Sequence, residues 1–325
     1  MPTASDELDR LLEGFREKRV RALARAISLA ERRDPQVREF WEGLGGDIPE
    51  PPVVGLTGAP GTGKSTLGDA LITFTRSQDR SIAIVAVDPN SPFSGGAVFG
   101  DRVRMQRHAL DPGVYIRSMG ARGHLGGVAV ATREAIRLVA AFGFDLVLVE
   151  TVGVGQSELE IAGIADTTLL VMAPGLGDDV QMIKAGIMEI ADIFVVNKAD
   201  LPGADHTVRQ LRTALNLAPP PTGWKPPIVL TSAARGEGVE DLWKAIEKHR
   251  HWLKESGQFE AQRQARLRDE TADLVGEWAR AGARRRLTED GKLASLLAKE
   301  KAPYGAAELI LSENREELVP RTDGD

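Results

Sequence analysis

The sequence contains no cysteine among its 325 residues, so it can form no disulfide bond and offers no thiolate to a metal ion or to redox chemistry. That absence fits a reducing compartment, and we expect a cytoplasmic protein. The sequence also has no excess of positive charge, because 41 lysines and arginines stand against 47 aspartates and glutamates, for a formal net charge of −6. Nucleic acids and anionic membranes attract basic surfaces, so we expect neither as a partner.

Long apolar runs are missing as well. No stretch reaches the roughly 18 apolar residues that a membrane-spanning helix needs, and the N-terminus lacks the continuous apolar core of a secretory signal. An organelle transit peptide is a poor match too, because such peptides avoid acids and this N-terminus carries several, among them Asp6, Glu7 and Asp9. The sequence therefore predicts a protein that is neither secreted nor embedded in a membrane.

A glycine-rich turn between an apolar run and a helical segment organises the chain. Residues 53–57 are apolar or β-branched, and residues 58–65 have the spacing G-x-x-x-x-G-K-S. Backbone N–H groups of such a loop bind a polyphosphate, Lys64 reaches the outer phosphates as a catalytic group, and Ser65 can ligate Mg²⁺. The residues expected at the phosphates are Gly58, Ala59, Pro60, Gly61, Thr62, Gly63, Lys64, Ser65 and Thr66.

Seven apolar runs alternate with helical segments along the middle of the chain. They are Val53 to Thr57, Ile82 to Val87, Val114 to Ser118, Asp145 to Val149, Thr168 to Met172, Ile193 to Val196 and Ile228 to Thr231. Continuous apolar character marks strands that are buried on both faces. We therefore predict an α/β fold of the P-loop NTPase class, with a mostly parallel sheet flanked by helices and with helical N- and C-terminal extensions.

The expected domains are a helical N-terminal arm over residues 1–50, a P-loop GTPase domain over 51–255 and a helical C-terminal arm over 256–325. The last of these carries an apolar stripe at helical spacing, formed by Leu267, Thr271, Leu274 and Trp278. A narrow stripe needs a surface that buries it. That surface could belong either to the same chain or to a second subunit, and the sequence leaves both alternatives open.

A second motif indicates which base the nucleotide carries. Asn197-Lys198-Ala-Asp200 directly follows the run 193–196, so it lies at the carboxyl end of a strand, where ligands bind in open α/β sheets. The Asp200 carboxylate can accept hydrogen bonds from N1–H and N2–H₂ of guanine, whereas adenine offers no such pair. Ser232 and Ala233 follow the last predicted strand and match the loop whose backbone N–H contacts guanine O6 in GTP-binding proteins.

Three acids are candidates for the metal side of the site. Asp88 ends the second run, Asp101 lies in the loop beyond it, and Glu150 ends the fourth run at the position of a Walker-B acid. We expect Asp101 and Glu150 to serve catalysis as well. Gly153 can contact the γ-phosphate through its N–H, and Gln156 is the candidate for positioning the attacking water.

Six strings of residues together point to one known family. They are residues 58–66, 87–96 with 100–105, 117–127, 150–158, 197–200, and 224–227 before 231–233. These strings resemble the MeaB/ArgK-type G-protein chaperones of adenosylcobalamin-dependent methylmalonyl-CoA mutase and related acyl-CoA mutases. The resemblance covers nearly the whole chain, and the strings 117–127 and 150–158 are the most specific to that family.

The resemblance implies a slow GTPase that a partner stimulates and that gates cofactor loading and protection of the mutase, with adenosylcobalamin belonging to the partner. It also implies a homodimer joined through the C-terminal arm, and switch segments around Asp88, Asp101, Glu150 and residues 173–184.

Three other functions stay open from the sequence. A GTP-dependent metal-insertion accessory protein would need soft or imidazole ligands, and here only His249 and His251 among the five histidines are close in sequence. A phosphotransferase would need an acceptor pocket and a base, of which the sequence shows neither. A nucleotide-gated binding protein without turnover would have the same motifs.

Overall fold

The seven apolar runs form seven strands of one sheet in the computed structural model. Its describable residues are 4–46, 48–88, 106–108, 110–120, 127–151, 161–175, 187–217, 223–291, 293 and 303–313. The strands are β1 Val53–Thr57, β2 Ile82–Asp88, β3 Val114–Gly120, β4 Leu146–Thr151, β5 Thr167–Met172, β6 Ile193–Val196 and β7 Ile228–Leu230. Each lies within a residue or two of its predicted ends, and Glu150 lies inside β4 instead of ending it.

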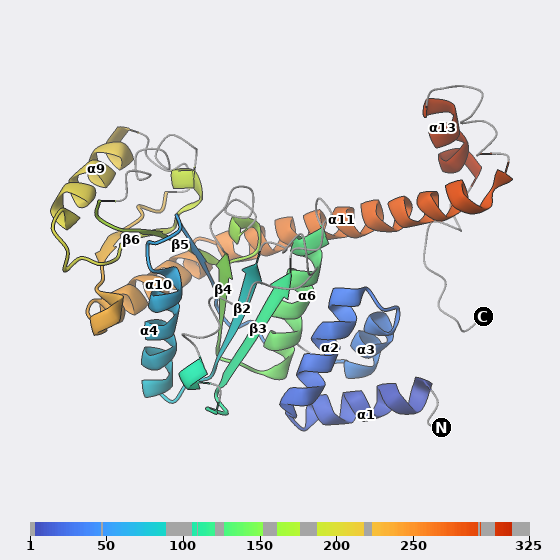
Figure 1. Cartoon of the computed structure of the whole chain (residues 1–325), viewed down its shortest axis with the longest axis horizontal. Coiled ribbons are helices and arrows are strands. Elements are labelled where there is room, and N and C mark those ends of the chain that lie inside the picture. Colours follow the sequence, from blue (N-terminus) through green and yellow to red (C-terminus); the bar gives the residue numbers. More distant parts are fainter. Residues whose placement is uncertain are drawn as a thin grey trace. The chain divides into compact units, whose positions relative to one another are not determined.

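The strand order is β3-β2-β4-β1-β5-β6-β7, and every pairing is parallel. The predicted parallel sheet is therefore confirmed. Because all strands point the same way, the segments that follow β1, β2, β4, β6 and β7 leave the sheet at one edge. That edge receives the glycine-rich turn after β1 and the Asn197 motif after β6 (Figure 1).

Helices cover both faces of the sheet. The α-helices described in this part of the chain are α1 Ala4–Arg16, α2 Val20–Arg32, α3 Gln36–Leu44, α4 Lys64–Ser77, α6 Gly127–Phe142, α9 Ala204–Leu217 and α10 Val239–Glu255. Side chains alternate between the faces, so Val53 and Val147 pack with α6 and the N-terminal helices, while Val54 and Leu148 pack with α4 and α10. Helix α9 packs on β5 and β6.

The three N-terminal helices share a core with α6. Phe15 lies edge-on to Phe40 and Phe142, with ring centroids 5.1 and 5.2 Å apart. The polypeptide turns between α1 and α2 at Lys18, whose φ is 59°, and the Lys18 ammonium donates to the carbonyl of Phe142. Residues 1–262 form one compact unit and residues 263–325 a second, and the expected domain boundaries at 50 and 255 stay predictions.

The second unit contains most of α11 (Gln258–Glu289) and all of α13 (Tyr304–Glu313). Leu293, Ala306 and Ile310 form a small buried cluster there. On α11, Leu267 and Trp278 of the predicted stripe are 40% and 41% exposed in the single chain. Within the described residues, no helix is long and apolar enough to cross a membrane.

A buried histidine joins α10 to the amino edge of the sheet. His249 is 1% exposed, lies against Trp224 and Trp252, and has its Nδ1 2.9 Å from Thr167 Oγ1. Burial lowers the pKa of His249 from 6.5 to about 4, because the imidazolium would lose its hydration. Asp192 Oδ1 lies 3.4 Å from Nε2 of the same ring.

We expect this histidine to make the fold sensitive to acid. Its pKa is lower in the folded chain than in the unfolded chain, so its contribution is complete above about pH 6.5 and is lost as the pH falls from 6.5 towards 4. Between pH 7.5 and pH 5 the free energy of unfolding should drop by at most about 2 kcal/mol from this residue. Urea unfolding of wild type and His249→Gln at both pH values measures it.

The exposed His251→Gln variant is the matched control and should keep the wild-type pH slope. An equal slope in wild type and His249→Gln would show that another group causes the acid sensitivity.

Candidate nucleotide-binding site

Two glycines of the phosphate loop are required by close approaches of the backbone. Gly58 has a φ of 139°, and a Cβ there would lie 2.1 Å from the carbonyl oxygen of Val171 on β5. Gly63 has a φ of 90°, and a Cβ there would lie 2.5 Å from Asn197 Nδ2. Any other side chain would be strained at either position. The loop therefore curls tightly between β1 and α4, against the end of β5 and against Asn197.

Helix α4 begins at Lys64, directly after the loop, so the positive end of its dipole lies at the loop. The Lys64 side chain is 8% exposed, and its ammonium donates to the carbonyls of Gly58 and Ala59 at 2.7 and 3.2 Å. The ammonium is thus held inside the curl of the loop. A phosphate bound to the N–H groups of this loop would meet that charge.

Ser65 and Glu150 bring two oxygen ligands together. Ser65 Oγ donates to Glu150 Oε1 at 2.7 Å, and the two residues are 8% and 3% exposed. They come from α4 and from β4, which is paired with β1 in the sheet. Buried oxygen ligands of this kind suit a hard cation such as Mg²⁺.

Asn197 ties three loops together at the same edge of the sheet. Its Nδ2 donates to the carbonyl of Thr62 at 2.9 Å, and its Oδ1 accepts from Thr231 Oγ1 and from the backbone N–H of Ala233, both at 3.1 Å. Asn197 is 2% exposed, so these bonds are shielded from water. The phosphate loop and the predicted base-binding loops are therefore fixed relative to each other by one side chain.

Lys198 and Asp200 extend from the same turn. Lys198 has a φ of 56°, a strained conformation for a residue with a side chain, and its ammonium donates to the carbonyl of Gly61 at 2.7 Å. Asp200 Oδ1 accepts a hydrogen bond from Ser232 Oγ at 2.8 Å, and this bond lowers the pKa of Asp200 below its usual value. The carboxylate is therefore ionised and can accept hydrogen bonds from a base.

One residue at this position was not predicted from the sequence. Arg235 Nη2 lies 3.2 Å from Asp200 Oδ2 and adds to the lowering of the pKa of Asp200. It belongs to a short 3-10 turn, Ala233–Arg235, in which no pattern of the sequence distinguishes it from any exposed arginine. Only the turn that brings Arg235 back to Asp200 reveals the contact.

The structure brings most of the predicted residues together at this edge. The residues that lie there are those of the phosphate loop together with Lys64, Ser65, Glu150, Asn197, Lys198, Asp200, Ser232 and Ala233. Asp88 ends β2 at the same edge, but its side chain lies outside the described residues. Asp101, Gly153 and Gln156 also lie outside them, so their roles stay predictions.

No group of three or more histidines, aspartates and glutamates that could hold a metal ion occurs within the described ranges. The His249 ring packs against the rings of Trp224 and Trp252, whereas His251 is exposed and pairs with Glu255 on its own helix. These two neighbours in sequence therefore do not form a shared ligand pair. Within the described residues, the histidines therefore provide no ligand set for the metal-insertion alternative.

Comparison with protein families gives one match over most of the chain. Residues 23–284 match the model described as "Methylmalonyl Co-A mutase-associated GTPase MeaB". Among solved structures, the crystal structure titled as the LAO/AO transport system kinase superposes with a TM-score of 0.69. It is 24% identical and covers 96% of this chain and 98% of that one, so it supports the fold alone.

Three curated relatives are similar over most of this chain. A protein of Pyrococcus horikoshii named only as a GTPase is 46% identical over 308 residues, which is 94% of this chain and 97% of that protein. The GTPase ArgK of Escherichia coli is 34% identical over 330 residues, 98% of this chain and 94% of that one. The mouse mitochondrial protein named methylmalonic aciduria type A homolog is 35% identical over 83% of this chain and 69% of its own length.

Proposed function

This chain belongs to the MeaB family of P-loop GTPases, and we propose that it uses GTP hydrolysis to gate cofactor loading and protection of an adenosylcobalamin-dependent acyl-CoA mutase. The observation that supports the nucleotide part most strongly is the network around Asn197. Its side chain joins the phosphate loop to the loops that carry Asp200 and Ala233. A nucleotide whose phosphates lie on α4 would place its base at Asp200.

Hydrolysis of GTP requires that the phosphates be held and that developing negative charge be neutralised. Lys64 supplies a buried ammonium, and α4 supplies its amino-terminal dipole. Gln156 stays the predicted residue for orienting the attacking water. We propose that a partner completes this part of the site, so that intrinsic turnover is slow and rises when the partner binds.

Ser65 and Glu150 are the described residues that would hold Mg²⁺, with Asp88 and Asp101 as further candidates. A bound Mg²⁺ would neutralise charge on the outer phosphates. The direct contact between Ser65 and Glu150 supports this assignment because both groups are oxygen ligands and both are buried.

We expect Glu150→Gln to weaken the dependence of hydrolysis on Mg²⁺. The glutamine oxygen can still accept the hydrogen bond from Ser65, but the negative charge that attracts the cation is gone. The Mg²⁺ concentration at half-maximal GTPase rate should rise about tenfold or more. A titration of the rate with Mg²⁺ at saturating GTP measures this.

Glu240→Gln, an exposed acid on α10 that pairs with Lys244, is the matched control and should titrate like wild type. A Glu150→Gln enzyme with the wild-type midpoint would remove Glu150 from the metal site.

The mutase as partner is supported by the description of the family, which names methylmalonyl-CoA mutase. The decisive experiment is a pull-down from the native host with the GDP-loaded and the GTP-analogue-loaded protein, followed by GTPase assays with the recovered mutase. Adenosylcobalamin would be bound by that mutase and not by this chain. Absence of a mutase from both eluates, with no stimulation by the purified enzyme, would leave a GTPase with another partner.

We further propose that the chain forms a homodimer through the apolar stripe of α11. The support is the exposure of Leu267 and Trp278 in the single chain, since a water-facing apolar stripe on a helix favours association. The full-length protein should therefore be a dimer at micromolar concentration. The double variant Leu267→Asp/Trp278→Asp should be a monomer, as measured by light scattering.

Asp269→Arg, a charge change on the opposite side of α11, is the control and should remain dimeric. A wild-type monomer would show that the stripe has another role.

A further inference from the structure

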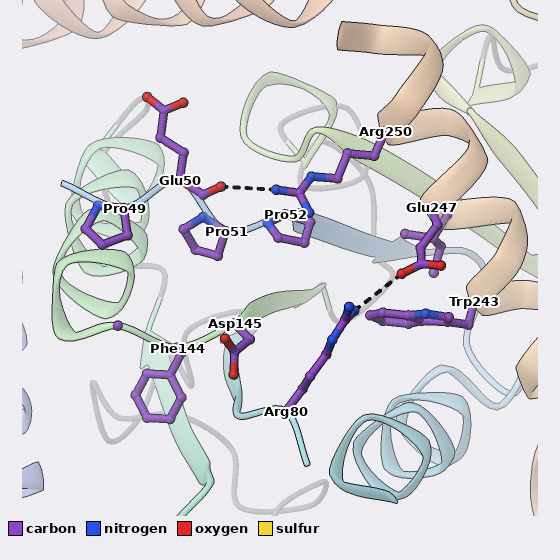
Figure 2. A pocket seen from close by; sticks show the side chains of 12 residues that line it. Pro49, Glu50, Pro51, Pro52, Arg80, Phe144, Asp145, Trp243, Glu247 and Arg250 are labelled. Atoms are coloured by element: carbon purple, nitrogen blue, oxygen red, sulfur yellow. Dashed lines mark hydrogen bonds and ion pairs between the residues drawn. The ribbon is translucent and has the colours of Figure 1, made fainter. Parts of the chain in front are cut away.

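A cavity of about 420 Å³ lies at the amino edge of the sheet. Its lining comes from the segment 49–52 before β1, from Arg80 before β2, from 143–145 before β4 and from α10 (Figure 2). The phosphate loop follows β1, so the five residues of that strand, roughly 17 Å, separate the cavity from the loop. None of the residues of the nucleotide-binding site lines it.

About half of the cavity wall is apolar. Pro51, Pro52, Trp243 and Ile246 line it, and the last two are buried against the core. The Arg80 guanidinium lies 5.5 Å from the centre of the Trp243 ring and 3.3 Å from Glu247. The apolar part of a small ligand could pack against these rings and side chains.

None of the three carboxylates that line the cavity, those of Glu50, Asp145 and Glu247, pairs with Arg250. Asp145 Oδ2 accepts hydrogen bonds from the backbone N–H and the hydroxyl of Ser81, both at 2.7 Å. Glu247 pairs with Arg80. Figure 2 shows the Glu50 carboxylate turned away from Arg250, which faces only the Glu50 carbonyl.

Arg250 is therefore a partly buried cation with weak partners. Its Nη2 donates to the Glu50 carbonyl at 3.5 Å, the outer limit of a hydrogen bond, and its Nε is shielded from water with no partner among the described residues. An N–H group that has lost water without gaining an acceptor carries an unrecovered desolvation cost, and this applies to Nε, whereas the contact of Nη2 is exposed. An anion that accepts a hydrogen bond from Nε would recover that cost, and the guanidinium geometry suits both carboxylate and phosphate groups.

We propose that this cavity binds a small organic anion, with its carboxylate or phosphate group on Arg250 and its apolar body against Pro51, Pro52 and Ile246. The volume lies within the range of small-molecule sites in proteins. This inference is independent of the mutase partner and of the nucleotide chemistry.

The test uses ¹⁹F NMR of the full-length protein saturated with GDP and Mg²⁺, so that the phosphate loop is occupied. The probes are 4-fluorobenzoate and 4-fluorophenyl phosphate, with neutral 4-fluorobenzamide and cationic 4-fluorobenzamidine for comparison. We expect at least one anion to bind about tenfold or more tightly than the amide, and the amidine to bind most weakly. The stronger of the two anions identifies the preferred head group.

Two variants with opposite expected effects locate the site. Arg250→Gln should weaken anion binding roughly tenfold or more, whereas Arg212→Gln, the same charge change on exposed α9, should leave it unchanged. Glu247→Gln removes a negative charge from the cavity and should tighten anion binding a few-fold. The Glu247 side chain is exposed, so we expect Glu247→Gln to fold. It therefore tests whether negative charge in the cavity weakens anion binding, even if Arg250→Gln does not fold.

Anions that bind no more tightly than the amide would overturn the proposal. So would equal anion affinities in Arg250→Gln and Arg212→Gln, or weaker anion binding in Glu247→Gln.

Discussion

Replacing Lys64 with alanine is expected to lower GTP turnover by roughly 10²- to 10³-fold or more. In the structure the Lys64 ammonium is held inside the phosphate loop by the carbonyls of Gly58 and Ala59. The other described lysine at this loop, Lys198, is bonded to Gly61 on the side of the base-binding loops and cannot take its place. Single-turnover hydrolysis at saturating GTP measures the loss in the chemical step.

Lys244→Ala serves as the control, because this exposed lysine of α10 pairs only with acids of its own helix. It should keep the wild-type rate. Binding of a fluorescent GDP analogue distinguishes lost chemistry from lost fold in Lys64→Ala. Wild-type turnover in Lys64→Ala would mean that the phosphates bind elsewhere.

The second large effect concerns the base. Asp200→Asn should weaken GDP binding roughly a hundredfold or more, because an amide can accept one hydrogen bond from guanine but presents a donor to the other N–H group. Xanthine has a carbonyl in place of the exocyclic amine, so XDP should bind the variant better than GDP does. Calorimetry with GDP, XDP and ADP on both proteins measures this reversal.

The fold should tolerate this change, because the asparagine oxygen can still accept the hydrogen bond from Ser232. Asp205→Asn, an exposed acid at the start of α9, is the matched control and should keep the wild-type preference for GDP. If Asp200→Asn bound GDP and XDP in the wild-type ratio, the carboxylate of Asp200 would not be reading the base.

Much of this site could be predicted from the sequence because its signals are local. The phosphate loop is a spacing of glycines, lysine and serine within eight residues, and the Asn197 motif directly follows an apolar run. Continuous apolar runs also predicted all seven strands and their parallel pairing, since strands buried on both faces need no alternation. The mutase proposed as partner was inferred from the family strings alone, because the chemistry of these residues does not indicate a partner.

The contacts that assemble the site depend on the tertiary structure. Ser65 meets Glu150 across 85 positions of sequence, and Asn197 meets Thr62 across 135, because the order β4-β1-β5-β6 places their strands together. The contact of Arg235 with Asp200 and the cavity around Arg250 also arise only when the chain has folded. Apolar pattern fixes which residues are buried and in which element they lie. Which buried or charged groups then become neighbours is decided by strand order and helix packing, and these depend on the whole chain at once.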